Sequence, residues 1–316
     1  MTQLLEIQDL NVVFQSQRKR YPALRNISFS VPQGSIVSMV GESGCGKSLT
    51  CRAIVRLLPE NAYLSGSIRF AGQDLLTLSS HEMQHLRGNA LSMIFQEPMT
   101  ALNPVLTVGW QTAEVAFTHE RCSKKTAYAR ALELFTAVGI PAAQERLQSY
   151  PHELSGGMRQ RVMIAMALMC NPKLLLADEP TTALDATISQ QILALLLDLR
   201  RQRGMTVLLI SHDLDTVEAI ADTCLVLYAG CLVEMAQTKE LFSNPLHPYT
   251  QGLLQAQPSR SHHAKRLATI PGVVPNLCAM PKGCPFAPRC AHAQPICHQQ
   301  MPPLRNLGNR KVACFL

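Results

Sequence analysis

Apolar residues gather in short runs along this chain, and several runs end at glycine or acidic residues. SIVSMV (residues 35–40), KLLLA (173–177) and VLLIS (207–211) have the length and composition of buried strands. LTCRAIVRLL (49–58) and TAYARALELFTAVGI (126–140) show helical apolar spacing. Strands that alternate with helices predict an α/β fold with a parallel sheet and crossover helices. No run approaches the roughly 18 apolar residues that would indicate a membrane-spanning helix.

Composition narrows the class of protein without naming it. An apolar fraction of 47% over 316 residues is typical of a chain with a substantial core, in one large domain or two. The net charge of +7 comes from scattered Lys and Arg and favours an anionic ligand or an anionic membrane surface. The start MTQLLEIQDL lacks a basic region followed by an apolar one, so we expect no secretory signal and a cytosolic location.

The segment GESGCGKSL (41–49) lies between a predicted strand and a predicted helix, which is where a phosphate-binding loop works. Its glycines let successive N–H groups point at phosphate oxygens, and the following helix adds the positive end of its dipole. Lys47 supplies a cation for the outer phosphates, and the Ser48 hydroxyl can bind the Mg²⁺ that bridges them. The predicted nucleotide-binding residues of the loop are Gly41, Glu42, Ser43, Gly44, Cys45, Gly46, Lys47, Ser48 and Leu49.

Two acids end another apolar run, in KLLLADEPTTALDA (173–186). Asp178, at the strand end, is placed to hold the magnesium shell. Glu179 would face the terminal phosphate, where a carboxylate can orient or deprotonate the attacking water. Acids after a strand also cap helices, so the pair becomes informative only together with the phosphate loop.

LSGGMRQR (154–161) resembles the signature motif of the ATP-binding-cassette (ABC) family, and its combination with the two elements above identifies the chain as a member. The resemblance implies a P-loop NTPase (RecA-like) nucleotide-binding domain with an inserted helical subdomain, using ATP and Mg²⁺. Ser155, Gly156 and Gly157 would begin an apolar helix and present a hydroxyl, N–H groups and a helix dipole to an anion. In the family that anion is the γ-phosphate held by the other cassette of a dimer.

The remaining family motifs occur in the expected order. Gln96, in MIFQEP, resembles the glutamine that touches both magnesium and the transmembrane partner. Asp185, in TTALD, resembles the loop that crosses the dimer interface, and His212, in SHD, resembles the switch histidine that contacts the γ-phosphate. The resemblance therefore implies that Glu179, His212 and Gln96 are catalytic, and that Ser48, Gln96 and Asp178 hold Mg²⁺.

Adenine needs a flat apolar partner, which the family usually offers ahead of the phosphate loop. Phe14 is the first choice and Tyr21 the second, with a place in the core as the alternative for Phe14. Cys45 lies inside the loop, so we expect a bulky thiol reagent to block ATP binding and ATP to protect against it.

Three further segments resemble a narrower branch, the ATPases of importers for oligopeptides, dipeptides, nickel and related solutes. They are EPMTALNP (97–104), YPHELSGG (150–157) and NPLHPYTQGLL (244–254). The resemblance implies an ATP-binding core of residues 1–96 and 158–240, an inserted helical subdomain of residues 97–157, and a C-terminal extension of residues 241–316.

This branch implies an ATPase subunit that powers import of di- or oligopeptides and lies peripherally on the cytoplasmic face of the inner membrane. Its implied partners are two transmembrane permease subunits, a second ATPase subunit that is a paralogue, and an extracytoplasmic solute-binding protein. Nucleic acid is not among them. A nickel or metal-chelate importer is the alternative, since other subunits choose the solute. An exporter ATPase and a soluble ABC protein of translation or DNA repair are disfavoured.

Five of the eleven cysteines follow residue 270, where the composition shifts to Pro, Cys, His and Arg. Disulfides rarely persist in a reducing compartment, so thiols on a turn-rich segment without an apolar core of its own favour a metal. Cys284, Cys290, Cys297 and Cys314 suit zinc or a four-iron, four-sulfur (4Fe-4S) cluster. The spacing lacks the CxxC pairs of zinc sites, and the resemblance favours the cluster, with zinc or no metal as alternatives. Cys278 is interpreted as a spare thiol.

Overall fold

The computed structural model describes residues 2–17, 19–97, 101–182, 184–257 and 269–316. The chain forms two compact units. The helical unit comprises Met1–Leu4, Pro32–Ser35 and Thr77–Leu209, and the phosphate-loop unit comprises Leu5–Val31, Ile36–Leu76 and Ile210–Leu316. Residues 98–100 of the segment EPMTALNP lie outside the described residues.

The strands of the helical unit are short and mostly buried. β6 (Leu91–Ile94) pairs in parallel with β7 (Leu174–Asp178), and β8 (Thr206–Ile210) lies on the other side of β7. Every residue of β7 and β8 is buried, as expected for parallel strands covered on both faces. The apolar runs at 173–177 and 207–211 are thus confirmed as strands.

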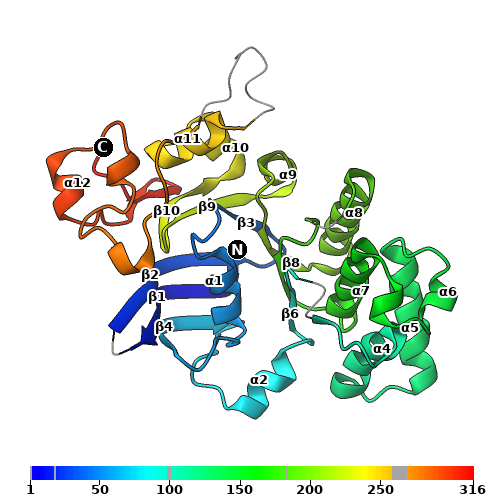
Figure 1. Cartoon of the computed structure of the whole chain (residues 1–316). Helices are drawn as coiled ribbons and strands as arrows, with labels where there is room; N and C mark the ends of the chain where they lie inside the picture. The colour runs from blue at the N-terminus through cyan, green and yellow to red at the C-terminus, as the bar shows by residue number, and fades with distance from the viewer. Residues whose placement is uncertain (1, 18, 98–100, 183, 258–268) are drawn as a thin grey trace. The chain divides into compact units, whose positions relative to one another are not determined.

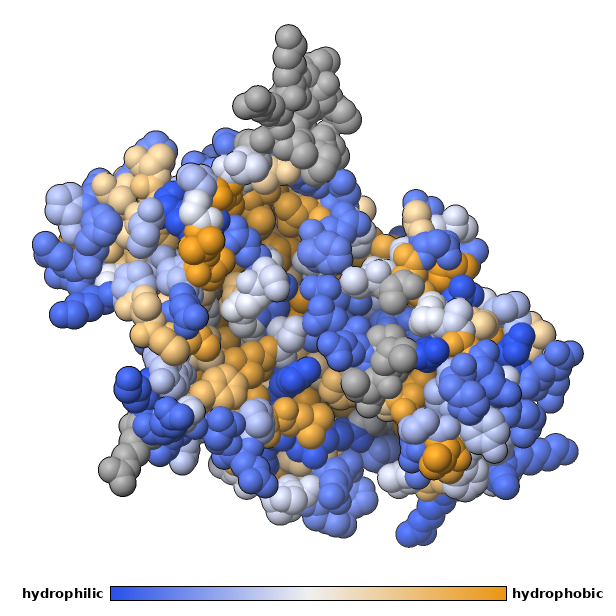
Figure 2. Space-filling model, viewed as in Figure 1, coloured by the Kyte–Doolittle hydropathy of each residue, from blue (hydrophilic) through white to orange (hydrophobic). Residues whose placement is uncertain are grey.

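Helices form the rest of this unit (Figure 1). α4, α5 and α7 pack against one another, and α7 also contacts β6. The predicted helix at 126–140 is observed two residues earlier and ends before Gly139, which has a φ of 74°. On the face seen in Figure 2, hydrophilic residues cover most of α5 and α6. The elements are α2 (Ser80–Leu86), α4 (Val108–His119), α5 (Lys124–Ala137), α6 (Ala143–Arg146), the 3₁₀ turn Pro151–Glu153, α7 (Gly156–Leu168) and α8 (Ala186–Arg203).

Trp110, on α4, is the chain's one tryptophan. The Lys124 ammonium lies 5.4 Å from its ring centroid, and the Phe117 ring lies at 5.7 Å. The cation over the ring face and the neighbouring aromatic ring fix the indole between α4 and the start of α5.

The phosphate-loop unit contains a four-stranded antiparallel sheet in the order β2-β1-β4-β5. Its strands are β1 (Gln3–Ser16), β2 (Lys19–Pro32), β4 (Ala62–Phe70) and β5 (Gln73–Asp74). Beside it, β3 (Ile36–Val40) pairs in parallel with β9 (Thr223–Tyr228), and β9 pairs antiparallel with β10 (Cys231–Gln237). The expected parallel sheet is therefore only part of the fold, because one sheet is antiparallel and the other combines parallel and antiparallel pairs.

The C-terminal residues belong to the same unit. β12 (Arg310–Val312) pairs antiparallel with β10, and β11 (Arg305–Leu307) pairs with β12. Phe286, Cys284 and Cys297 lie in one buried cluster with Tyr228 and Tyr249. The helices and turns of this unit are α1 (Lys47–Ile54), α9 (Leu214–Ile220), α10 (Thr238–Ser243), α11 (Pro248–Gln255), α12 (Pro295–Gln299) and the 3₁₀ turns Leu277–Ala279 and Ala287–Arg289.

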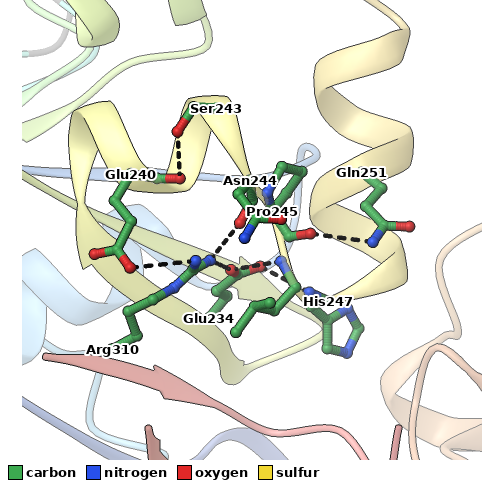
Figure 3. A network of polar contacts seen from close by, with 9 residues as sticks. Glu234, Glu240, Ser243, Asn244, Pro245, His247, Gln251 and Arg310 are labelled. Atoms are coloured by element: carbon green, nitrogen blue, oxygen red, sulfur yellow. Dashed lines mark hydrogen bonds and ion pairs between the residues drawn. The ribbon is translucent and has the colours of Figure 1, made fainter. Parts of the chain in front are cut away.

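A buried ion pair fixes β12 against β10 and the turn before α11 (Figure 3). The Glu234 side chain is fully buried, and its Oε1 lies 2.7 Å from Arg310 Nη2. The same carboxylate accepts the backbone N–H groups of Leu246 and His247, both at 2.9 Å. Arg310 also donates to the Asn244 carbonyl at 2.6 Å. Because both charges are paired and hydrogen-bonded, their burial is tolerated.

Within the residues that the structure describes, every helix is too short or too polar to cross a membrane.

Candidate nucleotide-binding site

The predicted phosphate loop connects β3 to α1, as the sequence indicates. Gly41 has a φ of 147°, and a Cβ there would lie 2.2 Å from the Leu227 carbonyl oxygen, so only glycine fits. Gly46 is the N-cap of α1 with a φ of 105°, and a Cβ there would meet Leu24 Cδ2 at 2.6 Å. The glycines are therefore needed for the loop path and for its close approach to neighbouring backbone.

Lys47 begins α1 and is 7% exposed. Its Nζ donates to the carbonyl oxygens of Gly41 at 2.7 Å and Glu42 at 3.1 Å, so the ammonium lies inside the curl of the loop. Cys45 has no exposed surface, and burial raises the pKa of its thiol despite the Lys47 ammonium, which acts in the opposite direction. This thiol is consequently a poor nucleophile, which makes labelling slower than the sequence alone implies.

Both aromatic candidates for adenine binding lie beside the loop. Phe14 and Tyr21 line an open pocket of about 510 Å³ together with Ser43 and Gly44. The pocket is also lined by residues 274–278, from the C-terminal part of the chain. Only Pro275 and Cys278 stand out in the sequence of this segment, and Cys278 is interpreted above as a spare thiol, so its place beside the loop was not predicted.

In the helical unit, Asp178 is the buried last residue of β7 and Glu179 follows it. Glu179 has a φ of 49°, the left-handed region that non-glycine residues rarely adopt and that recurs at functional sites. Its Oε2 accepts a hydrogen bond from Gln96 Nε2 at 3.2 Å and one from Thr182 Oγ1 at 3.1 Å. The structure thus brings together Glu179 and Gln96, which are far apart in sequence.

The signature residues begin α7. Ser155 is its N-cap, with Oγ accepting the Met158 N–H at 3.2 Å, and Gly156 and Gly157 form the first turn. A Cβ on Gly156 would meet nothing within 4 Å, so the backbone there is open on that side. Gln160, which the sequence analysis missed, is buried and donates to the Pro180 carbonyl at 2.9 Å. It links the signature helix to the turn after Glu179.

Two further predicted residues stand at the starts of helices. Asp185 is the N-cap of α8, and its Oδ1 accepts the Ile188 N–H at 3.0 Å. His212 is exposed and follows β8, in the phosphate-loop unit, directly before the N-cap of α9, Asp213. Local capping explains why Asp185 is fixed.

The four predicted cysteine ligands line one small cavity of about 20 Å³, which is also lined by His247 and His292. Gly283 permits this grouping, because a Cβ there would lie 2.2 Å from the Cys297 carbonyl oxygen. The Cys284 N–H donates to that oxygen at 2.7 Å. Burial raises the pKa of Cys284 to about 11 and also raises the pKa of Cys290, so both are protonated thiols near neutral pH.

Cysteine and histidine side chains are suitable ligands for a thiolate-bound metal, but their present positions in this cavity do not form a metal site. Across the described ranges, no three His, Cys, Asp or Glu side chains are arranged to hold a metal ion. The expectation of a closed four-cysteine site is therefore not supported by the structure.

Comparison with known proteins identifies the family. The ABC transporter family matches residues 24–182, and the family described as oligopeptide/dipeptide transporter, C-terminal region, matches residues 233–297. Over 313 residues the chain is 47% identical to the oligopeptide transport ATP-binding protein OppD of Escherichia coli (strain K12), covering 99% of this chain and 93% of that protein. The chain belongs to the ABC transporter family.

This ABC ATPase has other relatives of similar identity. It is 47% identical over 312 residues to the dipeptide transport ATP-binding protein DppD of Haemophilus influenzae, covering 98% of this chain and 94% of that protein. It is 48% identical over 307 residues to OppD of Bacillus subtilis (strain 168), covering 96% and 86%. The expected family, the P-loop NTPase fold and the ATPase class are confirmed.

Solved structures agree on the cassette fold. A dimeric structure of a post-hydrolysis state of the ATP-binding cassette MJ0796, bound to ADP and Pi, matches with a TM-score of 0.68 and 27% identity, covering 74% of this chain and 98% of that one. An ATP-binding subunit of an ABC transporter matches with a TM-score of 0.63 and 26% identity, covering 76% and 92%. These cassettes are nearly fully covered, whereas about a quarter of this ABC ATPase has no counterpart in them.

Proposed function

We propose that this ABC ATPase powers the import of di- or oligopeptides across the cytoplasmic membrane. The observation that carries the proposal is the similarity along almost the entire chain to proteins named for oligopeptide and dipeptide transport, which includes the C-terminal region. The folded phosphate loop and the Gln96–Glu179 contact support a role in ATP hydrolysis. A nickel or metal-chelate solute is the alternative that the experiment below separates.

We assign the catalytic roles to three residues. Glu179 would orient or deprotonate the attacking water, and Gln96, which donates to its carboxylate, would hold that carboxylate in place. His212 would contact the γ-phosphate. The left-handed backbone of Glu179 supports a functional role, since such strain persists where the surrounding structure imposes it.

The nucleotide would be held by residues 41–49, with Phe14 or Tyr21 against adenine. Mg²⁺ supplies charge neutralisation at the phosphates when bound, and Ser48, Gln96 and Asp178 are the residues that would hold it. The Lys47 ammonium, now bonded to loop carbonyls, would exchange those bonds for phosphate oxygens.

The signature residues would act on a second cassette. Ser155, Gly156 and Gly157 would meet the γ-phosphate bound by a partner ATPase subunit, with Asp185 at the shared interface. The hydroxyl and first-turn N–H groups of α7 suit an anion. We further propose that residues 1–96 and 158–240 form the ATP-binding core, residues 97–157 the inserted helical subdomain and residues 241–316 an extension. The share of the chain that the solved cassettes leave uncovered, about a quarter, is similar in size to this proposed extension.

Partners and location follow from the transport role. The complex would contain two transmembrane permease subunits, a paralogous second ATPase and an extracytoplasmic solute-binding protein, with this chain peripheral on the cytoplasmic face of the inner membrane. Because the binding protein and the permeases choose the solute, their identity decides between peptide and metal.

We also propose that Cys284, Cys290, Cys297 and Cys314 hold a 4Fe-4S cluster after local rearrangement, with zinc as the alternative. Their shared cavity supports this, and the cluster requires the four thiolates as ligands. Anaerobic purification with iron, sulfide and zinc analysis tests it, using Cys284→Ser and, as the control, Cys278→Ser. Iron and sulfide lost only in Cys284→Ser would support the cluster; zinc alone, or no metal, would refute it.

The function itself is tested by tagging the chain at its N-terminus, solubilising membranes from its own cell in mild detergent and identifying the co-purifying proteins by mass spectrometry. Two permeases, a second ATPase and a solute-binding protein that carries peptides are expected. A binding protein that carries nickel would replace the peptide assignment, and recovery of only ribosomal or DNA-repair proteins would refute transport.

A further inference from the structure

Glu42, the second residue of the phosphate loop, is held from two sides. Its backbone N–H donates to Tyr249 Oη at 2.8 Å. Its carboxylate accepts two parallel hydrogen bonds from Arg289, with Nη1 to Oε2 at 2.7 Å and Nη2 to Oε1 at 3.1 Å. This bidentate pair joins residues that lie 247 positions apart in sequence.

The Arg289 side chain is 5% exposed, and all its donors are occupied. Besides Glu42, Nη1 donates to Tyr228 Oη at 3.2 Å. Nη2 donates to the Ile270 carbonyl at 3.1 Å, and Nε donates to the Pro271 carbonyl at 2.8 Å. The hydrogen bonds to Glu42 raise the pKa of the guanidinium. A lysine could keep the charge but not this fan of five bonds.

Arg289 also connects the loop to the cysteine cavity. It ends the 3₁₀ turn Ala287–Arg289, one residue before Cys290. Phe286, the N-cap of the same turn, lines the cavity, and its ring centroid lies 5.2 Å from that of Tyr228 and 5.4 Å from that of Tyr249. The two residues that bind Glu42 from outside the loop, Arg289 and Tyr249, are therefore both packed against the C-terminal cysteine region.

Without Arg289, an uncompensated carboxylate would lie on a loop whose ligand is a polyanion. The Glu42 side chain is 27% exposed, and its carboxylate would repel phosphate. We infer that Arg289 is a positioning residue for nucleotide binding: it holds and neutralises Glu42, so that the C-terminal region sets how well the phosphate loop accepts ATP. This inference rests on the ATPase function and is independent of the transported solute.

The test measures equilibrium binding of Mg-ATP and steady-state ATPase kinetics on the full chain. Arg289→Gln should weaken ATP binding on the order of tenfold, the effect of one unpaired charge at close range in a partly screened site. KM should rise while kcat at saturating ATP stays near that of the wild type. Arg305→Gln is the matched control, because Arg305 lies in the same C-terminal region and donates to the carbonyls of Cys314 and Leu316, away from the loop.

Rescue distinguishes neutralisation from general damage. In the double variant Glu42→Gln with Arg289→Gln, affinity should return to within about threefold of the wild type, since no carboxylate remains to repel the phosphates. If Arg289→Gln does not fold, Arg289→Lys, which retains the charge, should bind ATP more tightly than Arg289→Met. Wild-type affinity in Arg289→Gln, or a double variant no better than the single one, would overturn the inference while leaving the ATPase assignment intact. If the wild-type protein itself did not hydrolyse ATP, the proposed function would be refuted instead.

Discussion

Replacing Arg310 by methionine should destabilise the protein strongly. The change leaves the Glu234 carboxylate fully buried without its cation, while the Leu246 and His247 N–H groups still point at it. A charge pair at about 4 Å with an effective dielectric constant near 20 interacts by about 4 kcal/mol, and removal of one buried partner typically costs about 3–5 kcal/mol. Loss of the donor to the Asn244 carbonyl acts in the same direction.

Urea unfolding followed by circular dichroism measures this change in the free energy of unfolding. Arg305→Met is the control, because Arg305 is exposed on the neighbouring strand and donates to carbonyl oxygens rather than to a buried carboxylate, so its loss should cost at most about 1 kcal/mol. The double variant Glu234→Gln with Arg310→Met should be more stable than Arg310→Met alone, since no buried charge remains. A loss below about 1 kcal/mol for Arg310→Met would refute the argument that this pair fixes the C-terminal strands.

Three other predictions concern the site and its surroundings. Glu179→Gln should keep ATP binding and lose most turnover in a phosphate-release assay; full turnover would contradict the catalytic assignment. Burial lowers the pKa of His247 to about 4 from 6.5, so the unfolded chain takes up the proton first and stability falls as pH drops through this window, by about 2 kcal/mol at about pH 5. In urea titrations at about pH 7 and about pH 5, the free energy of unfolding of His247→Asn should fall by less between the two pH values than that of the wild type; an equal fall would contradict this cause. Peptide mapping should show maleimide reacting with exposed Cys278 well before buried Cys45, and modification of Cys45 should abolish ATP binding; retained binding would refute the expectation that a bulky group on Cys45 blocks the nucleotide.

The sequence predicted the elements whose signals are local. A glycine loop between an apolar strand and a helix is encoded within about ten residues, and the structure confirms β3, the loop and α1 there. The position of Asp178 at the end of β7, with Glu179 directly after it, was predicted in the same way, because a buried apolar run and the acids that follow it are adjacent in sequence.

Contacts between distant segments could not be predicted. Neither Arg289 nor Glu42 carries a pattern that points to the other, and the approach of residues 274–278 to Phe14 depends on the fold of the C-terminal region. β11 was missed because the sequence RNL is short, polar and exposed, which gives no alternation to read. The antiparallel strand pairs were missed for a different reason: the direction of a strand depends on how the chain connects it to its neighbours, which the pattern of a single strand does not encode.

Trp110 gives the protein an internal optical reporter. It is fixed on α4 within the helical unit, whereas the buried tyrosines Tyr228 and Tyr249 lie in the phosphate-loop unit. Excitation selective for tryptophan therefore reads the helical unit alone, through a ring that lies 5.4 Å from the Lys124 ammonium. Events at the phosphate loop that reach this unit would appear as a change in emission without any introduced label.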